Sequence, residues 1–114
     1  MTINQSLKDK QCIPCQGGVP PLEEEKKVEL LGELHKRWQL SEDKKRISCV
    51  YPTLEFKHAM ELAQKIALLA DEQWHHPELL VAYDRIEIAI WTHKINDLVE
   101  SDYIFAAKVD ALLD

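Results

Sequence analysis

The sequence predicts an α+β domain with a four-stranded antiparallel sheet and helices packed on one of its faces. Three observations carry this prediction: apolar residues recur at helical spacing in three segments, strand-like runs come in two pairs, and a few polar residues join the members of each pair. Because strands joined by short turns pair antiparallel, the expected element order is α-β-β-α-β-β-α. We expect the other face of the sheet to stay open, and function to lie there.

The first helix is expected to begin near Glu23, after an N-terminal arm. Residues 1–21 are rich in glycine, proline and polar residues, so we predict a loosely ordered arm there and a single domain over residues 22–114. Three acidic residues at 23–25 suit the start of a helix dipole, and Val28, Leu31 and Leu34 follow at helical spacing.

A hairpin and the strongest helix come next. The strands are expected in RWQLS (37–41) and RISCVY (46–51), separated by the charged EDKK. Pro52 ends the second strand, and Thr53 is a candidate N-cap for the helix. Two stripes are expected to form its buried face: Phe56, Met60, Ala63, Ala67 and Ala70, widened by Leu62, Ile66 and Leu69.

The last three elements follow the same logic. Strands are expected in LLVAY (79–83) and RIEIAIWTH (85–93), and in the second one the isoleucines at 86, 88 and 90 share a face. A final helix is expected in SDYIFAAKVDALL (101–113), where Phe105, Val109 and Leu112 have helical spacing and Ser101 or Asp102 stands at the start.

Length, charge and cysteine content limit the class of protein. A chain of 114 residues suits one domain, and its net charge of -6 argues against a protein that finds nucleic acid or anionic membrane by electrostatics. The only dense basic run, residues 44–46, is expected to be a solvated turn. No apolar run approaches the roughly 20 residues of a membrane span and no targeting segment is evident, so we expect a cytoplasmic protein. Three cysteines do not suggest a disulfide framework, and reduced thiols are expected.

Two adjacent histidines, His75 and His76, stand before Pro77 where the helical pattern ends. An imidazole with an ordinary pKa near 6.5 can give and take a proton around neutral pH. Neighbouring side chains of a regular element point in different directions, so both can reach one ligand only where the backbone turns, and Pro77 favours a turn. His93 at a strand end and Asp102 at a helix start could converge with the pair.

Other interpretations of these residues stay open. Histidines are common as partly exposed residues at the ends of elements. A zinc site is a further alternative, but adjacent histidines are an awkward chelating pair, and the Cys12–Cys15 motif lacks the second pair that structural zinc needs. We therefore expect no metal. The sequence has neither a glycine-rich nucleophile elbow nor a phosphate loop, which leaves proton transfer as the favoured chemistry.

The ordered set Asp71, His75-His76-Pro77, Tyr83, Thr92-His93 and Asp102 resembles the signature of the pterin-4a-carbinolamine dehydratases. The similarity extends over about residues 22–113. It implies an enzyme that removes water from a 4a-hydroxytetrahydropterin to give the quinonoid dihydropterin, recycling the tetrahydropterin cofactor of aromatic amino acid hydroxylases. It implies no metal or organic cofactor, and it implies a four-stranded α+β domain that assembles as a homodimer or homotetramer through sheet edges and helices.

The resemblance also assigns roles by position. His75 and His93 look like a general acid/base pair, one protonating the departing 4a-hydroxyl while a ring N–H proton is lost, and His76 looks like the residue that holds and polarises the pterin. Asp71 and Asp102 would orient imidazoles. The positions that it implies for substrate binding are Trp74, His75, His76, Trp91, Thr92, His93 and Lys94.

Three residues depart from the family pattern. Trp74 stands where an acidic or amide residue is expected, and it either stacks on the flat pterin or extends the apolar stripe of the preceding helix. Asp97 replaces a common glycine, and Val99 replaces a Ser or Thr that often caps the last helix. A different class of function also stays open, a noncatalytic interaction protein that acts as a transcriptional cofactor, because some relatives are dimerisation partners of transcription factors.

Overall fold

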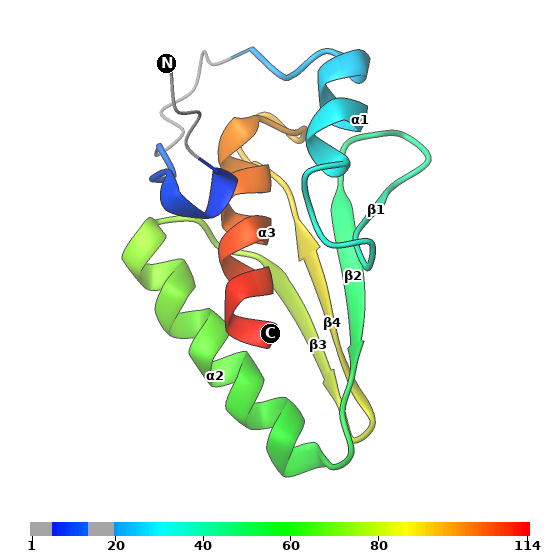
Figure 1. The fold of residues 1–114 in the computed structure, drawn as a ribbon, viewed down its shortest axis with the longest axis vertical. Helices are drawn as coiled ribbons and strands as arrows, with labels where there is room; N and C mark the ends of the chain where they lie inside the picture. Colours follow the sequence, from blue (N-terminus) through cyan, green and yellow to red (C-terminus); the bar gives the residue numbers. More distant parts are fainter. Residues whose placement is uncertain (1–5, 14–19) are drawn as a thin grey trace.

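In the computed structural model, which describes residues 6–13 and 20–114, a four-stranded sheet is covered on one face by helices (Figure 1). The strands are β1 (Gln39–Leu40), β2 (Ile47–Pro52), β3 (Glu78–Ala82) and β4 (Arg85–Ile90), and the helices are α1 (Glu24–Leu31), α2 (Phe56–Gln73) and α3 (Glu100–Leu113). A short 3-10 helix, η1 (Leu7–Asp9), precedes them. The predicted α+β class and the order α-β-β-α-β-β-α of the main elements are confirmed.

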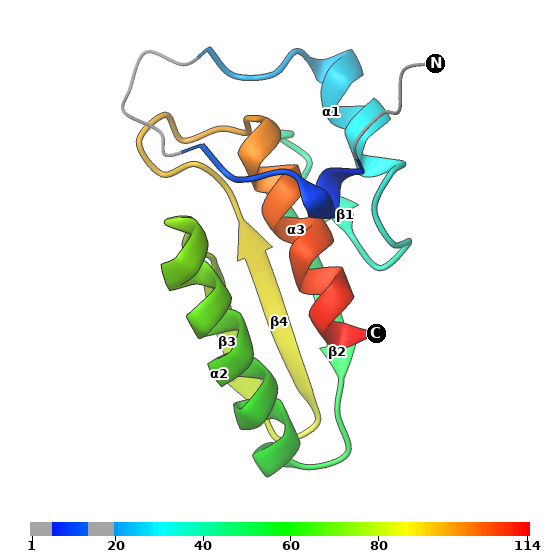
Figure 2. The same ribbon diagram turned by 60° about the vertical axis from the view of Figure 1, so that its left-hand side comes forward.

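The sheet has the order β1-β2-β4-β3, and every neighbouring pair is antiparallel. Helices α2 and α3 lie side by side across the same face (Figures 1 and 2). Ile86, Ile88 and Ile90 of β4 point into this layer and are buried, as their alternation predicts. The pairing of Ile47 with Ile90 sets the register of β2 on β4, so the residues just outside these two strand ends also become neighbours.

Helix α2 differs in two ways from what periodicity indicates. Its N-cap is Glu55 rather than Thr53, whose N–H instead donates to the carbonyl of Asp84 at 2.8 Å and so joins the helix approach to the β3–β4 turn. Phe56 and Met60 are 50% and 48% exposed, and Ala67 is exposed as well. The buried face is narrower than the two stripes together, because the helix touches the sheet and α3 through Ala59, Leu62, Ala63, Ile66 and Ala70.

The described part of the N-terminal arm packs against α3 (Figure 2). Leu7 and Cys12 are buried in the main core. The Cys12 N–H donates to Gln73 Oε1 at 3.2 Å, and the Ile13 N–H donates to Ser101 Oγ at 2.9 Å. The division of the chain into an arm (1–21) and a domain (22–114) stays a prediction, and Cys15 lies outside the described residues. Within residues 6–13 and 20–114, no helix is long and apolar enough to cross a membrane.

Candidate active site

The end of α2 separates the two adjacent histidines. The residue after the helix, Trp74, adopts the left-handed conformation (φ 53°, ψ 38°), and the N–H groups of Trp74 and His75 both donate to the carbonyl of Ala70. A left-handed residue commonly ends a helix, although a residue with a side chain pays about 1–2 kcal/mol for it. The backbone reverses at this point, so His75 turns inward and is buried, while His76 stays exposed.

His75 is held by the buried carboxylate of Asp102. Asp102 is 0% exposed, and its Oδ1 lies 2.6 Å from His75 Nε2. Its other oxygen, Oδ2, accepts hydrogen bonds from Thr92 Oγ1 and from the Val99 N–H, both at 2.8 Å. Because a carboxylate accepts at both oxygens, Nε2 of His75 is the donor and carries the ring proton. In the neutral imidazole this leaves the lone pair on Nδ1.

The same network replaces the missing cap of α3. Val99 is the N-cap and has no side-chain acceptor, but Asp102 at the third helical position accepts the Val99 N–H. In a capping box the side chain at the third helical position accepts the N–H of the N-cap residue, and the N-cap side chain accepts the N–H at the third position. The start of α3 keeps the first of these two bonds and lacks the second. The departure at position 99 therefore leaves the placement of Asp102 intact.

His76 pairs with the other predicted carboxylate. Its Nε2 lies 3.1 Å from Asp71 Oδ1, and both side chains are exposed. An exposed pair of this kind contributes roughly 0–1 kcal/mol to stability, so the contact orients the imidazole more than it supports the fold.

The loop that carries His93 begins where β4 ends. The strand stops at Ile90, and Thr92 and Asp97 form an isolated bridge that closes a short loop between them. The exposed His93 ring stacks on Trp91 with centroids 4.3 Å apart and ring planes inclined by 13°. The strand predicted for residues 85–93 therefore ends three residues early, at Ile90. Trp91 and His93 belong to the loop that follows, so their rings can stack on each other instead of pointing to opposite faces of the sheet.

Asp97 is tied down by a buried lysine. Its Oδ1 accepts hydrogen bonds from Lys27 Nζ and the Leu98 N–H, both at 2.7 Å. Burial by itself would raise the pKa of Asp97, but the hydrogen bonds from Lys27 and Leu98 outweigh it and hold this pKa below its usual range. Lys27 also donates to the carbonyl of Lys44, so one ammonium group joins α1 to two loops. The sequence around Lys27 contains no signal that it is the partner of Asp97. The carboxylate at position 97 indicates only that a cationic side chain should lie close to this loop.

The predicted residues surround one hollow of about 260 Å³, close to the lower limit of small-molecule sites. Its lining consists of Trp74, His75, His76, Trp91, Thr92, His93 and Lys94. These are the seven positions predicted for substrate binding. Asp102 lies behind His75, Asp71 lies beside His76, and Pro77 is partly buried next to the lining. Trp74 is 75% exposed, so the alternative that it extends the core is wrong.

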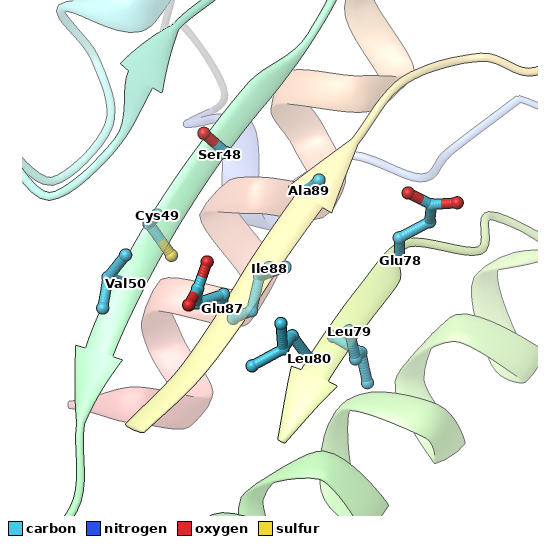
Figure 3. A pocket seen from close by; sticks show the side chains of 9 residues that line it. All are labelled: Ser48, Cys49, Val50, Glu78, Leu79, Leu80, Glu87, Ile88 and Ala89. Atoms are coloured by element: carbon cyan, nitrogen blue, oxygen red, sulfur yellow. The ribbon is translucent and has the colours of Figure 1, made fainter. Parts of the chain in front are cut away.

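The hollow lies just beyond the C-terminal ends of α2 and β4, not on the open face of the sheet where we expected function. These two C-terminal ends lie toward the same end of the molecule (Figure 2). The open face has a separate, shallow hollow of about 400 Å³ (Figure 3). Its lining is Ser48, Cys49, Val50, Glu78, Leu79, Leu80, Glu87, Ile88 and Ala89. It contains no histidine, and Glu87 is paired with Arg85 at 2.7 Å. Acid/base chemistry near neutral pH is therefore better supplied by the hollow with the histidines.

The arrangement suits proton transfer to and from a flat ligand. Three imidazoles line one concave surface, two of them oriented by carboxylates, and two indoles offer apolar area to a planar ring. In the part of the chain that the structure describes, no three His, Cys, Asp or Glu residues are arranged to hold a metal ion.

Comparison with known proteins agrees with these features. A family model described as pterin 4 alpha carbinolamine dehydratase matches residues 20–112. A Rickettsia bellii (strain OSU 85-389) protein, provisionally named pterin-4-alpha-carbinolamine dehydratase, is 47% identical over 112 residues, which cover 98% of each chain. A Rubrobacter xylanophilus protein with the same provisional name is 41% identical over 106 residues, or 93% of this chain and 97% of the other.

A solved structure is also similar. The crystal structure described as a transcriptional coactivator/pterin dehydratase from Brucella melitensis superposes with a TM-score of 0.77 at 29% identity. The match covers 83% of this chain and 100% of the other.

Proposed function

The chain belongs to the pterin-4α-carbinolamine dehydratase family, and from this premise we propose that it dehydrates 4a-hydroxytetrahydropterin to quinonoid dihydropterin. The observation that carries the proposal is the convergence of His75, His76 and His93 on one hollow. Recycling of the tetrahydropterin cofactor of aromatic amino acid hydroxylases is the proposed use of this activity, and location in the cytoplasm stays a prediction.

His75 is proposed as the general base. Its Nε2–H donates to Asp102, so the lone pair on Nδ1 is free to take the ring N–H proton of the substrate. The imidazolium that forms has the buried Asp102 carboxylate 2.6 Å away, which balances its positive charge without any movement of the protein. Thr92 and the Val99 N–H hold that carboxylate in place.

His93 is proposed as the general acid. The C4a–O bond breaks as the oxygen takes the bonding pair and a proton from His93, and water leaves. The electrons of the ring N–H bond then form the new C=N bond, and the released proton goes to His75. Solvent returns the proton from His75 to His93, so the reaction consumes none. His76 is proposed to hold and polarise the pterin, with Asp71 orienting its ring.

The test is the decay of a synthetic 4a-hydroxytetrahydropterin, followed by ultraviolet absorbance and corrected for its spontaneous rate. A positioned acid or base typically contributes about 10²–10⁴-fold, so His75→Ala and His76→Ala should each lower kcat/KM far below wild type. The matched control is His58→Ala, because His58 lies in the first turn of α2, at the opposite end from the hollow, and should leave turnover unchanged. Wild-type turnover in both His75→Ala and His76→Ala would remove the proposal.

A noncatalytic interaction role is the second candidate. It is favoured by one observation, that the Brucella melitensis structure is described as both a transcriptional coactivator and a pterin dehydratase. A binding module has no need to keep three histidines around one hollow. A stoichiometric protein partner together with no pterin turnover would favour this second role.

We also propose that the chain forms a homodimer or homotetramer. Among the described residues, strand β3 is at an edge of the sheet and pairs on one side only, so its other side can accept another strand. Phe56 and Met60 of α2 expose about half of their surface, which suits a helix interface. Sedimentation velocity at micromolar concentration tests the proposal, and a monomer there would contradict it.

A further inference from the structure

We propose that Arg46 is a positioning residue for His93, acting through the indole of Trp91 and the loop between residues 92 and 97. This inference rests on the proposed function, because it concerns the geometry of the group assigned there as the general acid. Arg46 belongs to the basic run that composition alone indicates to be a solvated turn, yet its side chain is partly buried and its guanidinium has two defined partners near the hollow.

The sheet register brings Arg46 to this place. Ile47 at the start of β2 pairs with Ile90 at the end of β4. Because the two strands are antiparallel, Arg46 just before β2 and Trp91 just after β4 become neighbours. The guanidinium carbon of Arg46 lies 4.0 Å from the Trp91 ring centroid, which is a close cation–π contact. The same indole stacks on His93 at 4.3 Å, so Arg46, Trp91 and His93 form one continuous set of contacts.

A second contact joins Arg46 to the loop itself. Its Nη2 donates to Asn96 Oδ1 at 2.6 Å, and Asn96 adopts a left-handed conformation with φ 52°. Left-handed residues with side chains are uncommon, and asparagine is among the residues that tolerate this conformation best. Arg46 therefore holds the loop from both ends, through Trp91 before His93 and through Asn96 after it.

Arg46 is a firm anchor because its own backbone is fixed in the β1–β2 turn. The Ser41 N–H donates to the Arg46 carbonyl at 2.9 Å, and the Arg46 N–H donates to Ser41 Oγ at 3.0 Å. Its Nη1 donates to the carbonyl of Lys45 at 3.0 Å. The guanidinium is thus held at a defined place relative to the sheet before any substrate binds.

The need for such an anchor follows from the exposure of His93. His75 has Asp102 and His76 has Asp71, but within residues 6–13 and 20–114 the His93 ring has no hydrogen-bond partner. Its orientation depends on stacking with Trp91. A misplacement of about 1 Å can lower a catalysed rate by about 10²-fold, so the group that holds Trp91 bears on the rate of the proton transfer from His93.

Arg46 does not line the hollow and reaches it only through Trp91, so the effect of its loss should be larger on kcat than on KM. We expect Arg46→Met, which keeps an apolar side chain of similar length, to lower kcat by about 10-fold with KM within about twofold. Arg46→Lys keeps the positive charge but loses the planar guanidinium group with its paired N–H donors, so its kcat should not return to the wild-type value. Arg85→Met is the matched control, because Arg85 lies at the other end of β4 with its own carboxylate partners, and kcat should stay at the wild-type value.

A double substitution separates positioning from a general loss of structure. In a Trp91→Leu background, Arg46→Met should produce little further fall in kcat, because both changes interrupt the same set of contacts. Additive losses would overturn the inference, as would a wild-type kcat in Arg46→Met or a change confined to KM, which would mean direct contact with substrate.

Nuclear magnetic resonance of the unliganded protein gives a readout that does not depend on turnover. Stacking on Trp91 shifts the His93 ring protons upfield, and we expect this shift to shrink in Arg46→Met while it is retained in Arg85→Met. An unchanged His93 shift in Arg46→Met would overturn the inference. Absence of pterin turnover in the wild-type protein would instead remove the proposed function and leave the positioning of His93 to be judged by this measurement.

Discussion

Replacing Asp102 by asparagine should invert the protonation of the His75 ring while keeping most of the buried network. The two bonds from Thr92 and Val99 both go to Oδ2, so the amide oxygen can take that place and accept both. The amide nitrogen then occupies the position of Oδ1, 2.6 Å from His75 Nε2, where it can only donate. The proton must move from Nε2 to Nδ1, and the proposed base loses its lone pair toward the substrate.

The expected magnitudes follow from these three bonds. A hydrogen bond to a charged group contributes about 1.5–3 kcal/mol and one between neutral groups about 0.5–1.5 kcal/mol. The substitution Asp102→Asn weakens the bonds but also removes a buried charge. We therefore expect it to lower the free energy of unfolding by about 1–3 kcal/mol. Asp102→Ala removes all three bonds and leaves the Val99 N–H without its acceptor, which should cost about 3–5 kcal/mol. Loss of a positioned base should lower kcat/KM of the asparagine variant by about 10²–10³-fold.

Three measurements test this reasoning. Urea unfolding at neutral pH gives the stabilities, absorbance decay of the 4a-hydroxytetrahydropterin gives kcat/KM, and nitrogen-15 resonance of the imidazole shows which nitrogen of His75 carries the proton. A folded Asp102→Asn protein with kcat/KM within about threefold of wild type would refute the role of His75 as base. Retention of the proton on Nε2 in that variant would refute the proposed tautomer.

Two further predictions follow from the pKa directions in the structure. Burial opposes the charged form of Asp97 and Lys27 favours it, and the net result is that the pKa of Asp97 is lower in the folded chain than in the unfolded one. The charged carboxylate therefore stabilises the fold above the ordinary pKa of about 4, and this contribution is lost as pH falls through the folded value. Urea titrations from pH 6 to pH 3 should show a shallower loss of stability for Asp97→Asn than for wild type, and equal slopes would contradict this. Burial raises the pKa of Cys12 to about 11 and that of Cys49 to about 12. At pH 8 both thiols should therefore resist iodoacetamide in the native protein and react with it in urea, as mapped by peptide mass spectrometry. Rapid labelling of either thiol in the native state would show that its burial is not maintained.

The pattern of apolar residues was sufficient to predict the elements and their order. Helical spacing and period-two alternation depend on residues a few positions apart, so the isoleucines of β4 could be assigned to the buried face without a structure. The same local information failed at Thr53 and at Phe56. Whether a residue caps a helix, or whether an apolar stripe is covered, depends on what packs against it, and Thr53 is used by the β3–β4 turn instead.

The candidate site divides in the same way. The sequence shows the His75-His76-Pro77 turn, the strand end near His93 and the carboxylate at position 102. In the structure, the three histidines line the same hollow. The sequence does not show which atoms meet, because His75 and Asp102 are separated by 27 positions and meet only when α2 and α3 lie across the same face.

The sequence by itself therefore determined the α+β class, the order of elements and the residue types that can move a proton. Only the tertiary structure decided that Lys27 neutralises Asp97 and that Arg46 contacts Trp91, and it placed the hollow at the end of the sheet instead of on its open face. The physical reason is that these contacts depend on the strand order β1-β2-β4-β3 and on the pairing of Ile47 with Ile90, which place residues dozens of positions apart at one end of the sheet.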